Sequence, residues 1–250
     1  MAFIGCGLTQ LPYDSGGGLG TNVDRGNSGD IQVYPDDDQD VILVYTGHGG
    51  TALRPFSNVR SAWESDGWTV RESDVFPEDL RPFRLIVLVD TGANRTEDAG
   101  NFTDEEMQAL SRSLQRGSRI VLLKEPNSEG ICHSDAFDQL IDQWGVPFRY
   151  ESVLSSDGVG TTQTFDSFAS SEQLTEQVGR LSFRGPCALS TGGTWLVRGA
   201  DSTPLVSRHE GSAGGDVVLI GDVDLLKNTV ASPDNNDNVV FAQNLARIVP

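Results

Sequence analysis

The chain has 250 residues, a formal net charge of -18 and a pI of about 4.3, with 37% hydrophobic residues. The acidic balance excludes nucleic acid and anionic lipid as partners held by charge, because their phosphates would be repelled. No apolar run approaches the roughly 18 residues that cross a bilayer, so no transmembrane helix is predicted.

Residues 1–40 show no periodic apolar pattern. They contain seven Asp, one Arg and several closely spaced glycines. This composition predicts a flexible, acidic, Gly-rich tether ahead of the folded part. The Asp-rich run at residues 36–40 lacks the Gly turn and the final Glu of a calcium loop, so no metal site is predicted there.

Near its beginning the sequence reads Phe3-Ile4-Gly5-Cys6, which resembles the end of a bacterial lipoprotein signal. Only two residues precede this motif, and a complete signal would have a charged and a longer apolar stretch there. Two interpretations follow. Cys6 carries a lipid and the protein works in the cell envelope or periplasm, or the match is chance and the protein is cytoplasmic.

From residue 41 to residue 250, short apolar runs alternate with helical patterns. Strands are predicted at 41–45, 67–71, 85–89, 120–123, 146–153, 187–190, 194–198, 204–208 and 217–220. Helices are predicted at 53–65, 103–117, 135–144 and 238–248, with a short one near 172–178. At the start of the second helix, Thr103 and Glu106 have the spacing of a capping box. Continuous apolar strands that alternate with helices are typical of a parallel sheet covered on both faces.

We therefore predict one α/β domain, a flavodoxin-like three-layer sandwich with a mainly parallel central sheet. The strands at 41–45, 85–89, 120–123 and 217–220 should form its buried middle, since they are the most apolar runs. The short strands between residues 187 and 208 are predicted to form a separate, hairpin-like layer.

Acidic side chains follow several of the predicted strands. Asp90, Glu125 and Asp222 each come at or just after a strand end, Asp224 lies two residues further on, and His48 lies in a Gly-rich loop. Ligands of open α/β sheets bind at the carboxyl ends of the strands, so these residues are candidates for ligand binding. Neighbouring carboxylates could share a proton or hold a cation.

Each candidate also has a structural interpretation. Asp222 and Asn238 could satisfy loop N–H groups and cap the last helix. His48 could be an ordinary polar residue beside glycines that adopt positive φ. Its loop lacks the Lys-Ser/Thr of a phosphate-binding loop, so no nucleotide cofactor is predicted.

The order of the segments resembles the class I glutamine amidotransferase-like superfamily over about residues 40–250. The segments are "DVILVYTGHGG", "SDGWTV", "FRLIVLVD", "FTDEEMQALSRSLQRGSRIVLLKE", "FDQLIDQWGVPF", "GGDVVLIGDVDLLKN" and "DNNDNVVFAQNLARI". The last two are similar to divergent branches: trehalose-utilisation-like proteins, and an uncharacterised domain of gliding-motility-associated transport proteins. The matching positions are Gly221, Asp222, Asp224, Leu226, Asn228, Asp237 and Asn238.

Active amidotransferases of this superfamily carry a Cys nucleophile in a Gly-x-Cys-x-Gly elbow and a late His-x-Glu. Here Cys132 lies in the right region, but Ser134 replaces the second Gly, and the elbow is displaced from the preceding strand. His209-Glu210 has the wrong spacing. A thiolate nucleophile needs a tight elbow and a positioned base, so we predict that Cys132 is not an acyl-transfer nucleophile.

If Cys6 carries a lipid, Cys132 and Cys187 are the two thiols left, and they would lie in an oxidising compartment. We then expect them to form a disulfide. In a cytoplasmic protein they would instead be two reduced, buried thiols.

Two functions remain open. The resemblance implies a non-catalytic cell-envelope binding or assembly domain, associated with a transport or motility complex. The alternative is a hydrolase or lyase that acts on a small polar or sugar substrate through the carboxylates and His48. The partner is then a protein or a small polar ligand, and a membrane contact would come only through a lipid anchor. A pocket lined by His48, Asp90 and Asp222 would favour the enzyme, whereas carboxylates bonded to backbone would favour the binding domain.

Overall fold

A computed structural model describes residues 40–48, 55–90, 101–127, 129–154, 161–170, 172–199, 201–211, 214–231 and 237–247. All of them belong to one compact unit, Tyr34–Pro250. The predicted tether, except Asp40, and the predicted lipid-bearing Cys6 lie outside these residues.

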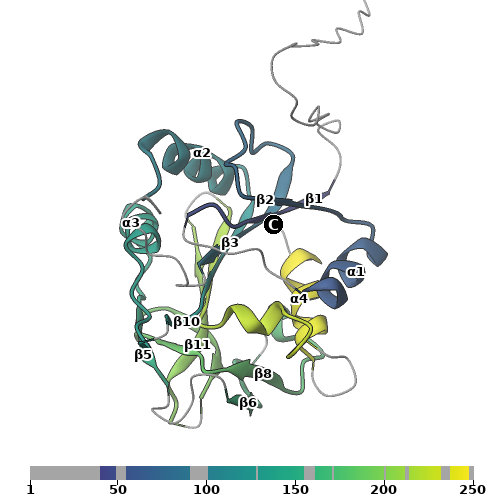
Figure 1. Ribbon diagram of the computed structural model, residues 1–250, viewed down its shortest axis with the longest axis vertical. Helices are drawn as coiled ribbons and strands as arrows, with labels where there is room; N and C mark the ends of the chain where they lie inside the picture. Colours follow the sequence, from purple (N-terminus) through teal and green to yellow (C-terminus); the bar gives the residue numbers. More distant parts are fainter. Residues whose placement is uncertain are drawn as a thin grey trace, which may run out of the picture. The chain divides into compact units, whose positions relative to one another are not determined.

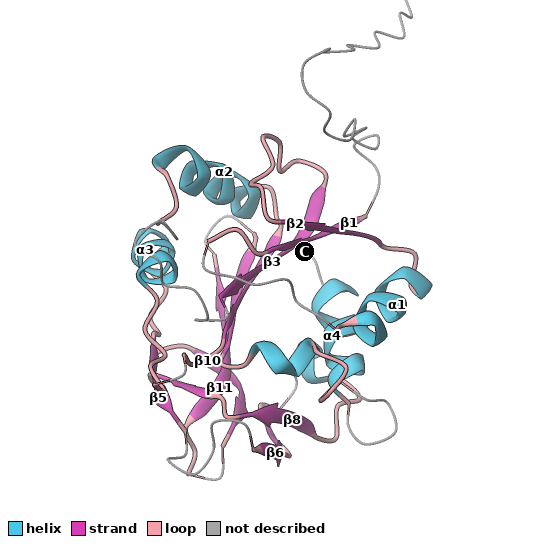
Figure 2. Cartoon of the chain, viewed as in Figure 1, coloured by secondary structure: helices cyan, strands magenta, loops and turns pink. Residues whose placement is uncertain are grey.

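A central eight-stranded sheet organises this unit (Figures 1 and 2). Its strands are, in spatial order, β2 (Thr69–Ser73), β1 (Val41–Tyr45), β3 (Phe83–Asp90), β4 (Arg119–Lys124), β12 (Asp216–Ile220), β11 (Pro204–Glu210), β10 (Thr194–Arg198) and β7 (Ser167–Phe168). The pairings from β2 to β12 are parallel, and those from β12 to β7 are antiparallel. The predicted fold class is confirmed, and β1, β3, β4 and β12 are neighbours in the middle of the sheet.

The helices are α1 (Ser57–Ser65), α2 (Asp104–Gln115), α3 (Asp135–Trp144) and α4 (Asn238–Arg247), with 3-10 turns η1 (Gln173–Thr175) and η2 (Val223–Leu226). Figure 2 shows α1 and α4 on one face of the sheet and α2 and α3 on the other. Two short antiparallel pairs complete the fold: β5 (Tyr150–Val153) with β9 (Cys187–Leu189), and β6 (Thr162–Phe165) with β8 (Leu181–Arg184).

Alternating side chains of the middle strands build a core on each face. In β1, Ile42 and Val44 belong to the core that contains Trp63 of α1, whereas Leu43 belongs to the core that contains Leu140 of α3. Successive residues of a strand point to opposite faces, so an apolar run with both faces covered explains the layered arrangement. Within the described residues, no helix is long and apolar enough to cross a membrane.

Several boundaries differ from those predicted. The first helix begins at Ser57 instead of residue 53, the strand at 146–153 is reduced to β5, and the short helix near 172–178 is the turn η1. The hairpin of β10 and β11 is not a separate layer, because β11 pairs with β12 and extends the central sheet. The open side of β12 needs a hydrogen-bonding partner, and β11 supplies it.

At the amino ends of β4 and β12, a buried ion pair joins the two strands. The guanidinium of Arg119 donates to both carboxylate oxygens of Asp216 at 2.7 and 2.9 Å, and to the Leu245 carbonyl at 2.7 Å. Arg208 of β11 also donates to Asp216, at 2.6 Å. The network ties β4, β11, β12 and the end of α4 together.

Candidate functional site

A cluster of charges lies at the carboxyl ends of the middle strands. Lys227 Nζ is 2.5 Å from Asp224 Oδ1 and 3.2 Å from Glu125 Oε2. We call Glu125, Asp224 and Lys227 the edge cluster. Beside it, Lys124 Nζ is 3.2 Å from Asp90 Oδ2, and the Glu125 N–H donates to the Asp90 carbonyl at 2.9 Å. Of the acids predicted at strand ends, Asp90 and Glu125 lie at this edge with Asp224, and a lysine contacts each of these carboxylates.

The two lysines were not expected from the sequence. Lys124 is the last residue of a buried strand, and Lys227 follows Asp224 by three residues. A spacing of three residues brings side chains together on one turn of helix. The sequence therefore offered a weak local signal for the pair of Asp224 and Lys227. The contact between Lys227 and Glu125 joins segments far apart in sequence and had no local signal.

Burial sets the protonation of the edge cluster. It raises the pKa of Glu125, Lys227 opposes the rise, and the neighbouring Asp224 adds to it. Burial lowers the pKa of Lys227, but Asp224 and Glu125 outweigh that effect and leave the pKa raised. Lys227 is therefore an ammonium ion at neutral pH, held between Asp224 and Glu125.

Asp222 is fully buried and bonded to backbone. Its Oδ2 accepts a hydrogen bond from the Arg184 N–H, and its Oδ1 accepts one from the Asp224 N–H at 2.8 Å. The second bond caps the turn η2. Burial raises the pKa of Asp222 well above its ordinary value of 3.8. The contacts correspond to the structural interpretation of this residue.

Asn238 is also buried and makes three bonds to main-chain atoms. Its Oδ1 accepts from the Ser182 N–H at 2.9 Å, and its Nδ2 donates to the carbonyls of Ser182 and Leu225 at 2.8 and 2.9 Å. The preceding Asp237 accepts from the N–H groups of Gly179 and Arg180. The start of α4 thus fastens β8 and η2 to the sheet, which is a structural task.

His48 belongs to a different environment, beside α2. Its Nε2 is 3.1 Å from Glu106 Oε2, and its ring lies 4.2 Å from the ring of Phe102. Glu106 also completes the predicted capping box, because it accepts from the Thr103 N–H at 2.8 Å. Burial and then the Glu106 charge raise the pKa of nearby Tyr45. His48 thus contacts the start of α2 and its aromatic neighbours.

A disulfide joins Cys132 to Cys187, as predicted, with a Cα–Cα distance of 5.7 Å and both residues fully buried. It connects the loop before α3 to β9. The Cys187 N–H donates to the Gly221 carbonyl at 2.6 Å, and a Cβ on Gly221 would lie only 1.9 Å from the Cys187 carbonyl oxygen. The segment from Arg184 to Cys187 therefore covers the carboxyl end of β12, where a ligand crevice was predicted.

Metal binding has little support at this edge. Among the described residues, no group of three or more His, Cys, Asp or Glu side chains is arranged to hold a metal ion.

His209, the histidine compared above with the late His of amidotransferases, lies on β11, and its ring packs edge-on at 6.5 Å from the ring of Phe148.

No protein-family model and no curated protein matches the sequence. Solved structures do match. A cytoplasmic protein from Salmonella typhimurium has a TM-score of 0.54 at 10% identity, over 84% of this chain and 98% of its own. PurLQS from Thermotoga maritima has a TM-score of 0.49 at 14% identity, over 83% of this chain and 97% of its own. A ThuA-like protein from Bacteroides uniformis has a TM-score of 0.48 at 12% identity, over 88% of this chain and 95% of its own.

This chain spans about a third of the length of a further similar structure, an exo-β-1,4-mannosidase from an Opitutaceae bacterium, with 35% of that chain covered. Identities of 10–14% establish a relation in fold only, and a shared fold does not fix an activity. The chain shares the α/β sandwich fold of the Salmonella protein.

Proposed function

We propose that this chain is a non-catalytic binding or assembly domain of the cell envelope, which is anchored through Cys6 and works beside a transport or motility complex. The Cys132–Cys187 disulfide is the observation that carries the proposal. Disulfides persist in oxidising compartments and are rare in the cytoplasm of most organisms. The same bond removes the only thiolate that the amidotransferase resemblance would offer as a nucleophile.

The carboxyl edge supports this choice. Asp222 and Asn238 are engaged with main-chain N–H and C=O groups, and the segment around Cys187 lies over the end of β12. Both side chains are fully buried and bonded to the main chain, so neither is exposed to a substrate. The motif shared with the divergent branches is then a device that stabilises the last strand and helix.

Thiol accessibility tests the compartment. Cells that express the full chain are lysed in a denaturant that contains a bulky maleimide, with or without prior reduction, so that both buried cysteines become accessible. We expect Cys132 and Cys187 to react only after reduction. We also expect the chain to be recovered in the envelope fraction, and to migrate on native gels as part of a complex larger than the single chain. A Cys187→Ser variant should expose one extra thiol. The proposal would be contradicted if both cysteines reacted without reduction and the chain were found in the cytoplasm without a bound partner.

Activity tests the catalytic part. Oxidised and reduced protein are assayed for ammonia release from glutamine, beside a Cys132→Ala variant. We expect no turnover from any of the three. Ammonia release that appears on reduction and disappears in Cys132→Ala would establish an amidotransferase and contradict the proposal.

A second candidate is a hydrolase or lyase that acts on a small polar or sugar substrate. The edge cluster favours it, because a half-buried Glu125 with a raised pKa beside an ammonium group resembles an acid–base pair. A panel of nitrophenyl glycosides and esters would test it. Hydrolysis that falls at least about 100-fold in Glu125→Gln, within the range for a lost acid or base, would favour this candidate. An equal fall in Glu129→Gln, an exposed control, would count against it.

A further inference from the structure

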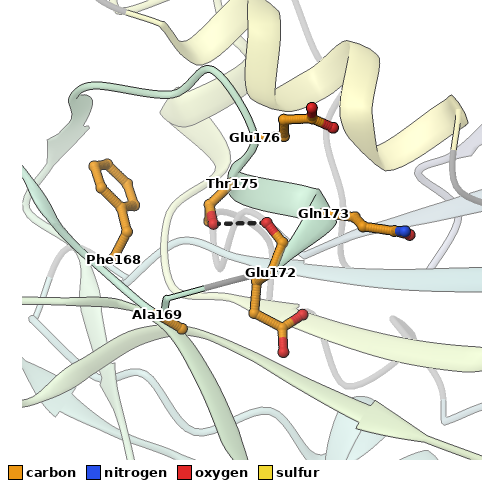
Figure 3. A pocket seen from close by; sticks show the side chains of 6 residues that line it. All are labelled: Phe168, Ala169, Glu172, Gln173, Thr175 and Glu176. Atoms are coloured by element: carbon orange, nitrogen blue, oxygen red, sulfur yellow. Dashed lines mark hydrogen bonds between the residues drawn. The ribbon is translucent and has the colours of Figure 1, made fainter.

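A cavity of about 500 Å³ lies between the edge strand β7 and the turn η1, away from the edge cluster. It is lined by Phe168, Ala169, Glu172, Gln173, Thr175 and Glu176 (Figure 3). Its volume falls within the range of small-molecule sites, which is roughly 300–1,000 Å³. It is therefore large enough for a small ligand.

Both walls are fixed by the fold. On the β7 side, the Ala169 N–H donates to the Leu196 carbonyl of β10 at 3.0 Å. On the other side, Asn244 of α4 donates to the carbonyls of Leu174 and Glu176 at 3.2 and 2.8 Å. The Thr175 hydroxyl closes the turn on the Glu172 carbonyl at 3.0 Å, as Figure 3 shows. The cavity is thus preformed, which lowers the entropy lost on binding.

The lining has a definite chemical character. It holds one aromatic ring, a methyl group, an amide, a hydroxyl and two carboxylates, and no lining side chain is positively charged. Arg208 is 3.6 Å from the Glu172 carboxylate and is itself shared with Asp216 and Glu210. The Glu176 side chain is exposed. Such a lining disfavours phosphates and carboxylates and attracts cations.

Figure 3 shows the carboxylates of Glu172 and Glu176 on different sides of the η1 turn, with the Phe168 ring apart from both. A cavity whose lining holds two carboxylates and an aromatic ring, each separated from the others, suits a flexible alkyl chain that carries ammonium groups. Ammonium groups pair with carboxylates and are attracted to the faces of aromatic rings. We propose that this cavity binds an alkyl diamine or polyamine, independently of the proposed function.

Calorimetric titration with 1,5-diaminopentane tests the proposal, with 1,5-pentanediol as the neutral probe of the same length. The buffer contains about 0.15 M salt, so that long-range attraction to the acidic surface is screened. We expect saturable binding of one diamine per chain and none of the diol. Glu176→Gln and Phe168→Ala should each weaken binding by roughly 5- to 30-fold, equivalent to about 1–2 kcal/mol.

Glu151→Gln is the matched control, because Glu151 is an exposed carboxylate on β5 that does not line the cavity. It should leave diamine binding unchanged, and circular dichroism should show all three variants folded. Equal weakening by Glu151→Gln would mean general attraction to an acidic surface and would overturn the proposal. Equal binding of the diol, or no diamine binding at about 10 mM, a concentration matching a free energy near −2.7 kcal/mol, would overturn it as well.

Discussion

At Gly221 the segment around Cys187 comes very close to the end of β12. An added Cβ would lie 1.9 Å from the Cys187 carbonyl oxygen, so Gly221→Ala must push β9 away from β12. We expect the free energy of unfolding to fall by about 2–3 kcal/mol, as for other overpacked sites, in a urea titration. Gly199→Ala is a milder control, because its Cβ would meet the flexible end of Leu154 at 3.0 Å. An unchanged midpoint for Gly221→Ala would show that β9 is free to shift.

A second prediction concerns Asp222 and the dependence of stability on pH. Its pKa is raised in the folded protein, mainly by burial, so the folded state binds more protons than the unfolded state above pH 3.8. Its contribution to stability is complete below that pH and is lost as the pH rises toward the folded pKa. Asp222→Asn removes the titration, so over the pH range from 3.8 upward the variant should gain stability relative to the wild type.

Parallel denaturant titrations of the two proteins across that range measure this difference. If Asp222→Asn loses hydrogen bonds, the difference in the free energy of unfolding between the two proteins changes by the same amount at every pH. The slope of that difference against pH stays the same. A difference that stays flat, or that moves against the variant as the pH rises, would mean that the two backbone N–H donors keep Asp222 ionised.

The sequence predicted where several site residues lie in the fold, but it did not predict which residues they contact. The strand ends placed Asp90, Glu125 and Asp224 at one edge, because parallel strands share their direction. Glu125 finds its ammonium partner, Lys227, and Asp222 one of its two N–H donors, Arg184, in segments distant in sequence that lie at that edge. Those contacts depend on how loops cross the sheet, which periodicity does not encode.

Among the elements, α4 shows how one polar side chain can fasten several segments. Asn238→Ala would remove three buried hydrogen bonds to Ser182 and Leu225. At about 1 kcal/mol for each bond, we expect unfolding to become easier by roughly 3 kcal/mol in thermal or chemical titrations. Asn228→Ala is the comparison, since its bonds lie on the exposed surface, and it should change stability by under about 1 kcal/mol. Equal effects of the two would remove the special role of Asn238.

The middle strands and the long helices could be predicted because their apolar patterns are continuous or periodic over many residues. The capping box of Thr103 and Glu106 fixed the start of α2 equally well. The strands β6, β7 and β8 were not predicted, because they have two to four residues, too few for a period to appear. The strand at 187–190 was predicted, but its pairing with β5 was not, because the tertiary fold sets that pairing.

For the whole molecule, the disulfide has the largest expected effect. It closes a loop of 55 residues, and the chain-entropy model assigns such a loop about 4 kcal/mol. The double variant Cys132→Ser, Cys187→Ser should therefore unfold at a markedly lower urea concentration than the oxidised wild type. The reduced wild type is the internal control and should match the double variant. Oxidised and reduced wild type with the same midpoint would show that the cross-link is dispensable.

The buried pair of Arg119 and Asp216 has a consequence for how such a sequence can change over generations. The two residues stand opposite each other on neighbouring strands. Losing Asp216 alone leaves the buried Arg119 guanidinium without its carboxylate, at a penalty of about 3–5 kcal/mol, and losing Arg119 alone leaves Asp216 with Arg208 as its remaining cation. Two apolar residues in their place could be as stable. A route to that pair that begins at Asp216 therefore passes through a weakened intermediate. Descendants of a common ancestor should keep Arg119 only where they keep Asp216.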